Sequence, residues 1–234
     1  MRDLCLAIEI SNPSADPGPS GTGPGVALGR AGAASGLLGV ELLPPGRSHD
    51  DDLVPAIDRL FRRHGAAPKD LARIAVSVGP GGFTSLRMAV AAAKMIAEAT
   101  GCACVPVASA DVVSRRVAGG RGPFAVALAS KGETAYVARF TAPGVGDGPG
   151  RVMGADDLET LGVRVVVADR FLGPGLRARC AALGVAVVAP VFDPAACFEA
   201  GARAPLVDAM ELAPIYPRLP EAVVKWRELH PPRA

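Results

Sequence analysis

The fold of this sequence is decided by the stretch Ile74-Ala75-Val76-Ser77-Val78-Gly79-Pro80-Gly81-Gly82-Phe83-Thr84-Ser85-Leu86-Arg87. Ile74 to Val78 has the length and composition of a buried strand, and a helix-forming segment runs from about Thr84 to Thr100. The turn between them brings backbone N–H groups to the positive end of a helix dipole, which is a frequent anion site. Anion binding is therefore the first role to consider for the turn.

The turn departs from both common phosphate-binding loops. In the loop G-x-x-x-x-G-K-[ST] a lysine follows the last glycine, whereas Phe83 and Thr84 follow Gly82 here. In G-x-G-x-x-G a third glycine stands where this chain has Thr84, and Pro80 removes one N–H donor. The pattern therefore favours a tight structural turn, with a phosphate site as the open alternative.

Composition excludes several classes of protein. The chain has 234 residues, of which 50% are hydrophobic and 21% charged, as expected for one large globular domain or two small lobes. No apolar run reaches the roughly 18 residues of a membrane span, and no basic region followed by a long apolar segment marks a secretory signal. The net charge of +2 is too small to indicate nucleic-acid binding. We therefore expect a cytoplasmic protein without a membrane segment.

The cysteines are odd in number, which argues against a disulfide framework. They are Cys5, Cys102, Cys104, Cys180 and Cys197, all within runs that predict strands or helices. This placement indicates buried free thiols in a reducing compartment. Cys102 and Cys104 alone do not favour a metal site.

The first half of the chain predicts the element order β-β-β-α-β-α-β-α. Strands are expected at Leu4 to Ile10, Val26 to Arg30, Leu37 to Leu43, Ile74 to Val78 and Cys104 to Val107, and helices from about Leu53 to Arg63, Thr84 to Thr100 and Ser109 to Val117. Three antiparallel strands extended by two parallel ones with crossover helices form the ribonuclease-H-like half of the actin and sugar-kinase superfamily.

Two polar residues at element ends are candidates for function. Glu9 ends the first strand, where ligand crevices of α/β folds open, although a solvated or Arg-paired carboxylate is the simpler interpretation. His49 precedes the first helix, where a histidine is more often solvated or capping than a ligand. Ser48 and Asp51 form the capping pattern for this helix, and Gly65 can end it.

The second half predicts a smaller α/β lobe. A hairpin is expected from Phe124 to Thr141, then a loop over 142–150, and after it a helix near Asp156 to Leu161, a strand Val163 to Ala168, a helix Leu176 to Leu183, a strand Val185 to Ala189 and a helix Pro194 to Arg203. Prolines keep the tail from Pro214 to Ala222 extended. We expect domains over residues 1–118 and 119–234.

Four places in the sequence carry a resemblance to a known family. Ser77 to Arg87 with Ala91-Ala92-Ala93-Lys94 resembles G-P-G-S-F-T-G-L-R and A-x-A-K-G of the bacterial tRNA threonylcarbamoyladenosine biosynthesis protein TsaB. The matched turn positions are Gly79, Pro80, Gly81, Gly82, Phe83, Thr84 and Arg87, with departures at Gly82 and Ser85. The other places are Leu6-Ala7-Ile8-Glu9-Ile10-Ser11 for L-A-I-D-T-S, Ser48-His49 with Leu53-Val54-Pro55-Ala56-Ile57 for H-S-E-x-L-L-P-x-I, and Ile215-Tyr216-Pro217-Arg218 with Glu221-Ala222 for Y-x-R and E-A.

The resemblance implies a two-lobed fold of the glycoprotease-like superfamily, related to the threonylcarbamoyltransferase TsaD, and a role as the non-catalytic partner of TsaD. It implies a TsaD-like partner, a TsaE-like ATPase in the assembled complex, contact with tRNA only through that complex, and a homodimer as a further option. TsaD-like enzymes bind metal through an H-x-x-x-H pair, whereas His49, His64 and His230 lie far apart here. We therefore expect no catalytic residue, no cofactor and no metal.

Two other classes of function stay open. One is an ATP-dependent enzyme of the actin and sugar-kinase class, in which Glu9 and the turn at Gly79 would lie on the phosphate side. The other is a hydrolase of the glycoprotease or serine type that uses Ser77 or Thr84 with His49. Neither a nucleophile elbow G-x-S-x-G nor a third orienting group supports the hydrolase.

Helical spacing predicts a partner surface on the second helix. Leu86, Val90, Ala93 and Ala97 form one apolar stripe, and Met88, Ala92, Met95 and Ala99 form another nearly opposite. One stripe covers the sheet, so the second needs the first helix or a partner. TsaB-like proteins pair through these two helices, and we therefore expect an interface of about 800 Å² per partner. Its predicted residues are Met88, Ala92 and Met95, with part of Leu53, Ile57 and Leu60.

Overall fold

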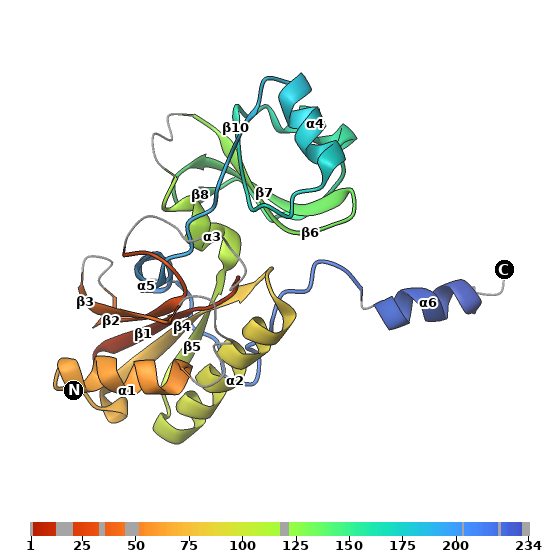
Figure 1. Cartoon of the computed structure of the whole chain (residues 1–234). Helices are drawn as coiled ribbons and strands as arrows, with labels where there is room; N and C mark the ends of the chain where they lie inside the picture. Colours follow the sequence, from red (N-terminus) through yellow and green to blue (C-terminus); the bar gives the residue numbers. More distant parts are fainter. Residues whose placement is uncertain are drawn as a thin grey trace.

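Two sheets of different size organise the chain. The computed structural model describes residues 2–12, 21–32, 36–44, 52–117, 122–202, 204–219 and 221–230. The first sheet has the strand order β3-β2-β1-β4-β5, and the second has the order β11-β10-β6-β7-β8 with β9 paired to β7. The two sheets form separate lobes that follow one another along the chain (Figure 1).

The first sheet has the predicted ribonuclease-H-like topology. Its strands are β1 Leu4–Glu9, β2 Gly25–Arg30, β3 Leu37–Leu42, β4 Leu71–Gly79 and β5 Ala103–Ala108. β1, β2 and β3 pair antiparallel, and β4 and β5 extend the sheet in parallel from β1. The predicted element order and fold class are therefore confirmed.

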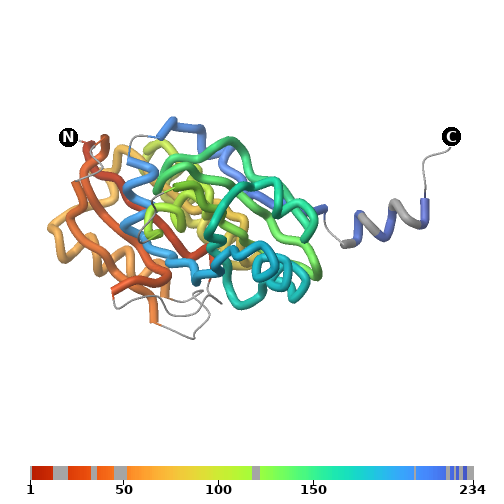
Figure 2. Tube along the Cα trace, turned by 90° about the horizontal axis from the view of Figure 1, so that it is seen from above, coloured from red at the N-terminus to blue at the C-terminus, as the bar shows by residue number. Residues whose placement is uncertain are grey.

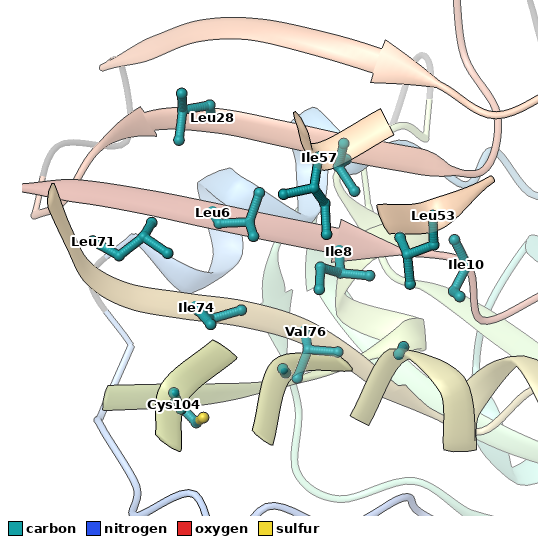
Figure 3. Packing of buried hydrophobic residues seen from close by; sticks show 14 of the residues in the cluster. Leu6, Ile8, Ile10, Leu28, Leu53, Ile57, Leu71, Ile74, Val76 and Cys104 are labelled. Atoms are coloured by element: carbon teal, nitrogen blue, oxygen red, sulfur yellow. The ribbon is translucent and has the colours of Figure 1, made fainter. Parts of the chain in front are cut away.

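Side chains alternate between the two faces of this sheet. Leu6, Ile8 and Val76 point to the face covered by α1 (Leu53–Arg63) and α2 (Phe83–Thr100), where they form the main hydrophobic core (Figure 3). The alternate positions along β1 and β4 hold small residues. Among these, Cys5, Ala7 and Ala75 lie on the other face of the sheet, against Phe198. Small residues on that face let a helix pack close to the strands.

The helix on the second face comes from the far end of the chain. α5 (Pro194–Gly201) packs on β1, β2, β4 and β5 of the first sheet, beside α3 (Ser109–Ser114). A Cβ at Gly201 would overlap the Cβ of Ala75, so glycine permits this close approach. We expected this helix within the second lobe, and that prediction is wrong. After β11 the chain returns to the first lobe, where it forms α5. The expected domain division at residue 118 stays a prediction.

The ends of α1 differ from the expected pattern. Ser48, His49 and Asp51 lie outside the described residues. Asp52 is the N-cap, and its side chain makes no capping hydrogen bond. At the other end Arg62 and Arg63 occupy the last turn, and Gly65 follows with a φ of +60°, a left-handed conformation that ends the helix.

The second lobe is a mixed sheet with helices on one side. Its elements are β6 Phe124–Lys131, β7 Thr134–Ala142, β8 Val145–Gly146, β9 Arg151–Met153, η2 Asp156–Leu161, β10 Val165–Ala168, α4 Pro174–Ala182 and β11 Ala186–Val188. The predicted hairpin is confirmed. The segment 142–150, expected as a loop, contributes β8, and the helix expected at Asp156 to Leu161 is a 3-10 helix.

The tail returns along the first lobe before it leaves the body of the molecule. The N–H of Ile215 donates to the carbonyl oxygen of Val78 at 2.7 Å. The tail then forms α6 (Glu221–Leu229), which lies apart from both lobes in Figures 1 and 2, so the expected non-helical segment ends sooner than predicted. None of the helices in the described residues has both the length and the apolar character that crossing a membrane requires.

Candidate functional site

The glycine turn is packed against the end of β1. The N–H of Gly82 donates to the carbonyl oxygen of Ser11 at 2.7 Å. Gly81 lies so close that a Cβ there would overlap the same oxygen. The N–H and the hydroxyl of Ser11 donate in turn to Oε1 of Glu9, at 2.8 and 2.6 Å. Turn and strand end therefore form one hydrogen-bonded unit.

Glu9 is buried inside this unit. Its side chain is fully excluded from solvent, and its Oε2 atom has no hydrogen-bond partner among the described residues. Burial raises the pKa of Glu9, and the hydrogen bonds from Ser11 offset part of that increase. The sequence predicted the position of this carboxyl at the strand end, but it did not indicate that the carboxyl is buried.

These contacts favour a structural role for the turn over a phosphate site. Gly82 already donates its N–H to Ser11, and Pro80 has no N–H to offer. An ionised Glu9 would also repel a phosphate placed beside Ser11. Neither Pro80 nor Gly82 can therefore donate a backbone N–H to a nucleotide phosphate, as the ATP-dependent alternative would require.

The described residues also lack a nucleophile and base pair for a hydrolase. Ser77 is fully buried, and its hydroxyl lies 2.9 Å from the hydroxyl of Ser109. Thr84 is exposed, and His49 lies outside the described residues. His230 Nδ1 lies 3.0 Å from the carbonyl oxygen of Trp226, and His64 Nε2 has no hydrogen-bond partner within the described segments. Neither of these histidines contacts a serine or threonine hydroxyl.

Metal-binding groups do not cluster in the described parts of the chain. No set of three His, Cys, Asp or Glu side chains lies close enough to hold an ion there. All five cysteines are free and buried, as predicted. Burial raises the pKa of Cys5 to about 12 and that of Cys104 to about 11, so neither thiol is a ready thiolate ligand at neutral pH.

The two apolar stripes of α2 have different environments. Leu86, Val90, Ala93 and Ala97 are buried against the sheet. Of the opposite stripe, Met88 and Ala92 are partly buried and Met95 is 73% exposed. Helical spacing therefore predicted the buried face of α2 and left Met95 on its exposed side, whereas Met88 and Ala92 also pack against the core.

The three residues predicted from α1 are buried, and of them only Ile57 borders the groove between α1 and α2. Leu53, Ile57 and Leu60 are buried in the main core, because this face of α1 packs on β2 and β3. Leu60 in particular has no exposed surface to offer a partner. The exposed apolar side chain of α1 is Val54, at 66%, which sequence analysis missed. Its position three residues before Ile57, at helical spacing, was the available signal.

An apolar groove separates α1 from α2. It has a volume of about 410 Å³, and we call it the α1–α2 groove. Its lining consists of Leu6, Val54, Ile57, Asp58, Phe61, Arg62, Ala66, Ala67, Pro68, Leu71, Ala92, Met95 and Ile96. The predicted interface residues Ala92 and Met95 thus meet Ile57 and Val54 in one concave surface. Met88 packs against the core and does not line this groove.

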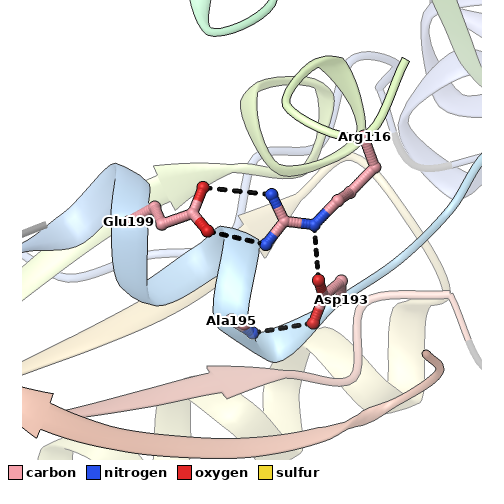
Figure 4. Close-up of polar contacts among 4 residues, drawn as sticks. All are labelled: Arg116, Asp193, Ala195 and Glu199. Carbon is pink, nitrogen blue, oxygen red and sulfur yellow. Dashed lines mark hydrogen bonds and ion pairs between the residues drawn. The ribbon is translucent and has the colours of Figure 1, made fainter. Parts of the chain in front are cut away.

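Ion pairs and hydrogen bonds hold the lobes and the tail in place. Arg116, just after α3, donates from Nε to Asp193 at 2.5 Å and from its two terminal nitrogens to Glu199 at 3.0 and 2.8 Å (Figure 4). Arg218 of the tail donates to the carbonyl oxygens of Ala129 and Thr134 in the second lobe, at 2.5 and 2.8 Å. Of these residues, sequence analysis singled out only Arg218, as part of the motif match.

The fold and site define a class before any comparison is made. A two-lobed α/β fold with the ribonuclease-H-like sheet order belongs to the actin and sugar-kinase type. In the described residues its strand-end carboxyl accepts hydrogen bonds from Ser11, and an apolar groove lies between α1 and α2.

Comparison with known proteins identifies the type of relative. Residues 44–143 match the family TsaD: tRNA N6-adenosine threonylcarbamoyltransferase. No curated protein matches the sequence at a significant level.

Two solved structures share the fold over almost the whole chain. One is described as an uncharacterized protein with similarity to peptidase YeaZ from Pseudomonas aeruginosa, and it superimposes with a TM-score of 0.72 at 22% identity, covering 92% of this chain and 100% of the other. The second, YeaZ from Pseudomonas aeruginosa, has a TM-score of 0.70 at 22% identity, and the match covers 92% of this chain and 99% of YeaZ. YeaZ is another name for TsaB, so the predicted resemblance to TsaB is confirmed at the level of the fold.

Proposed function

We propose that this chain acts in the biosynthesis of threonylcarbamoyladenosine in tRNA as the non-catalytic partner of a TsaD-like transferase. The TsaD family match and the fold shared with YeaZ support this process. The proposal places the chain in the cytoplasm, with a TsaE-like ATPase in the assembled complex and tRNA reached through that complex. A homodimer through the same surface is the alternative to a monomer when the transferase is absent.

The observation that carries the proposal is the α1–α2 groove. Val54 and Met95 are exposed large apolar side chains, and they line the same groove as Ala92. Small and flexible side chains at these positions allow a partner helix to approach closely, because alanine takes little space and methionine adapts its shape. Exposed apolar surface of this kind is typical of a protein interface.

The lack of an assembled active site in the described residues supports a non-catalytic role. Gly82 donates its N–H to Ser11, and the hydroxyl of Ser77 is buried against Ser109. The name peptidase in the description of the similar structure concerns that protein. For this chain, we expect purified protein to hydrolyse neither ATP nor peptides.

Gene deletion tests the proposal directly. Mass spectrometry of digested tRNA should show a loss of threonylcarbamoyladenosine in the deletion strain, restored by the wild-type gene. The Met95→Glu variant should fail to restore it although the protein accumulates, and Met210→Glu, at an 83% exposed position outside the groove, should restore it. Normal nucleoside levels in the deletion strain would rule out the proposed function.

A further inference from the structure

A second groove lies on the other side of α2. It has a volume of about 560 Å³. It is lined on the helix by Phe83, Arg87, Val90, Ala91 and Lys94, and on the tail by Leu212, Ala213, Pro214 and Tyr216. Successive residues of a helix turn by about 100°, so this lining lies roughly 150° around α2 from Ala92, Met95 and Ile96. We call it the aromatic groove. The aromatic groove therefore lies on a different side of α2 from the α1–α2 groove.

Two aromatic rings stand at one end of this groove. Phe83 is 60% exposed and Tyr216 is 45% exposed, and their ring centroids lie 5.5 Å apart with the planes inclined by 33°. Phe83 comes from the first turn of α2 and Tyr216 from the tail, so two distant segments bring the rings together. Burial of aromatic rings stabilises a folded protein, yet both of these rings remain partly exposed to solvent.

Positive charge runs along the same groove. The guanidinium carbon of Arg87 lies 5.0 Å from the centroid of the Phe83 ring, and Nζ of Lys94 donates to the carbonyl oxygen of Met210 at 3.3 Å. Neither side chain forms an ion pair with a carboxylate of the described residues, and no carboxylate lines the groove. The groove therefore combines stacking surfaces with two cations that have no anionic partner there.

We propose that the aromatic groove binds single-stranded nucleic acid, with a base stacked on Phe83 and Tyr216 and phosphates held by Arg87 and Lys94. Proteins that hold single strands combine aromatic platforms with a positive track for the backbone in this way. An acidic peptide would use the cations but would leave the exposed rings without a role, so the nucleic acid accounts for more of the groove. This inference goes beyond the proposed function, in which tRNA is reached only through the complex.

The binding test uses the isolated full-length chain. Fluorescence anisotropy is measured with labelled single strands of about eight nucleotides, as RNA and as DNA, and with an abasic strand of equal length. Phe83→Ala should weaken binding of the base-containing strands by roughly tenfold but leave binding of the abasic strand unchanged, because only stacking is lost. Comparison of RNA with DNA tells which sugar the groove prefers.

Salt dependence separates the role of the cations. The logarithm of the binding constant for a single strand falls with the logarithm of salt concentration by about 0.7 for each phosphate contact. Arg87→Ala or Lys94→Ala should therefore each reduce the slope by about 0.7. Both sites are on the surface of α2, so these variants should fold.

The second lobe offers a matched control. Arg170 lies over the ring of Phe171 at 5.1 Å, and Phe171 is 50% exposed, but neither residue lines the aromatic groove. Phe171→Ala should leave binding unchanged. Absence of binding by either strand, equal weakening by Phe171→Ala, or stronger binding of an acidic peptide with the same dependence on Arg87 would each overturn the inference. Since no transferase is present, these results do not depend on the proposed function.

Discussion

Replacement of Glu9 by glutamine should change the free energy of unfolding in favour of the variant as the pH rises. Glu9 is fully buried, and burial raises its pKa above the ordinary value of 4.5. A glutamine keeps the Oε1 acceptor for the N–H and hydroxyl of Ser11 but carries no charge. The variant therefore avoids the cost of either ionising the buried carboxyl or holding its proton at neutral pH.

Proton linkage sets the magnitude. Because the pKa of Glu9 is higher in the folded chain than in the unfolded chain, its favourable contribution is complete at a pH below about 4.5 and declines as the pH rises to the folded pKa. One proton gives a slope of at most about 1.4 kcal/mol per pH unit over that window. Above the folded pKa the cost is constant. Within that window, the free energy of unfolding of Glu9→Gln minus that of the wild type should therefore increase with pH by at most this slope.

Urea unfolding at several pH values between 4 and 8 measures the difference. The comparison of variant with wild type cancels the titration of the other groups that both proteins share. Glu98→Gln, at an exposed position of α2, controls for removing one carboxyl from the surface. A difference between Glu9→Gln and wild type that stays constant with pH would refute this account of Glu9.

Three further substitutions test the contacts that hold the site and the tail. Gly81→Ala places a Cβ against the carbonyl oxygen of Ser11 and should cost about 1–3 kcal/mol in urea unfolding, whereas Gly146→Ala, where the nearest atom is 3.7 Å away, should cost less; equal costs would contradict the close packing of the turn. Arg116→Ala leaves the buried carboxylate of Asp193 without its cation and should cost about 3 kcal/mol, and a cost below about 0.5 kcal/mol would show that the pair is not important. Arg218→Ala removes the hydrogen bonds of the tail to Ala129 and Thr134 and should speed hydrogen exchange at the amide of Ile215; unchanged exchange would mean that Arg218 does not hold the tail.

Much of the first lobe could be predicted because its signals are local. The β-branched run before the turn and the apolar spacing of α2 each fix a secondary structure within a few residues. The alternation of Leu6 and Ile8 with Cys5 and Ala7 also lies in the sequence, since a strand points successive side chains to opposite faces.

Features that depend on contacts between distant segments could not be predicted. The helical pattern from Pro194 gave α5 its conformation, but its place on the first sheet depends on a fit between Gly201 and Ala75. β8 has two exposed residues, so no hydrophobic pattern marks it. Helical spacing likewise gave α1 an apolar face, but only the packed structure shows that Leu60 is covered by the sheet and Val54 is not.

The sealed state of Glu9 is also a tertiary property. The strand that contains Glu9 was predicted, yet access of solvent to its end depends on how Ser11 and Gly82 meet. The sequence around a carboxyl at the end of a strand is the same whether that carboxyl is exposed to solvent or buried. The chemical role of such a residue therefore has to be judged from the packed structure.

The central claim, that the chain pairs through the α1–α2 groove, is tested most directly by size-exclusion chromatography with light scattering. The chain is mixed with a TsaD-like transferase, and wild type is compared with Ala92→Glu, Met95→Glu and the control Met210→Glu, with circular dichroism to verify folding. We predict that the two groove variants fold but elute without the transferase, because a partner would bury an unpaired carboxylate, while Met210→Glu still co-elutes. Co-elution of a folded Met95→Glu variant with the transferase would contradict the claim.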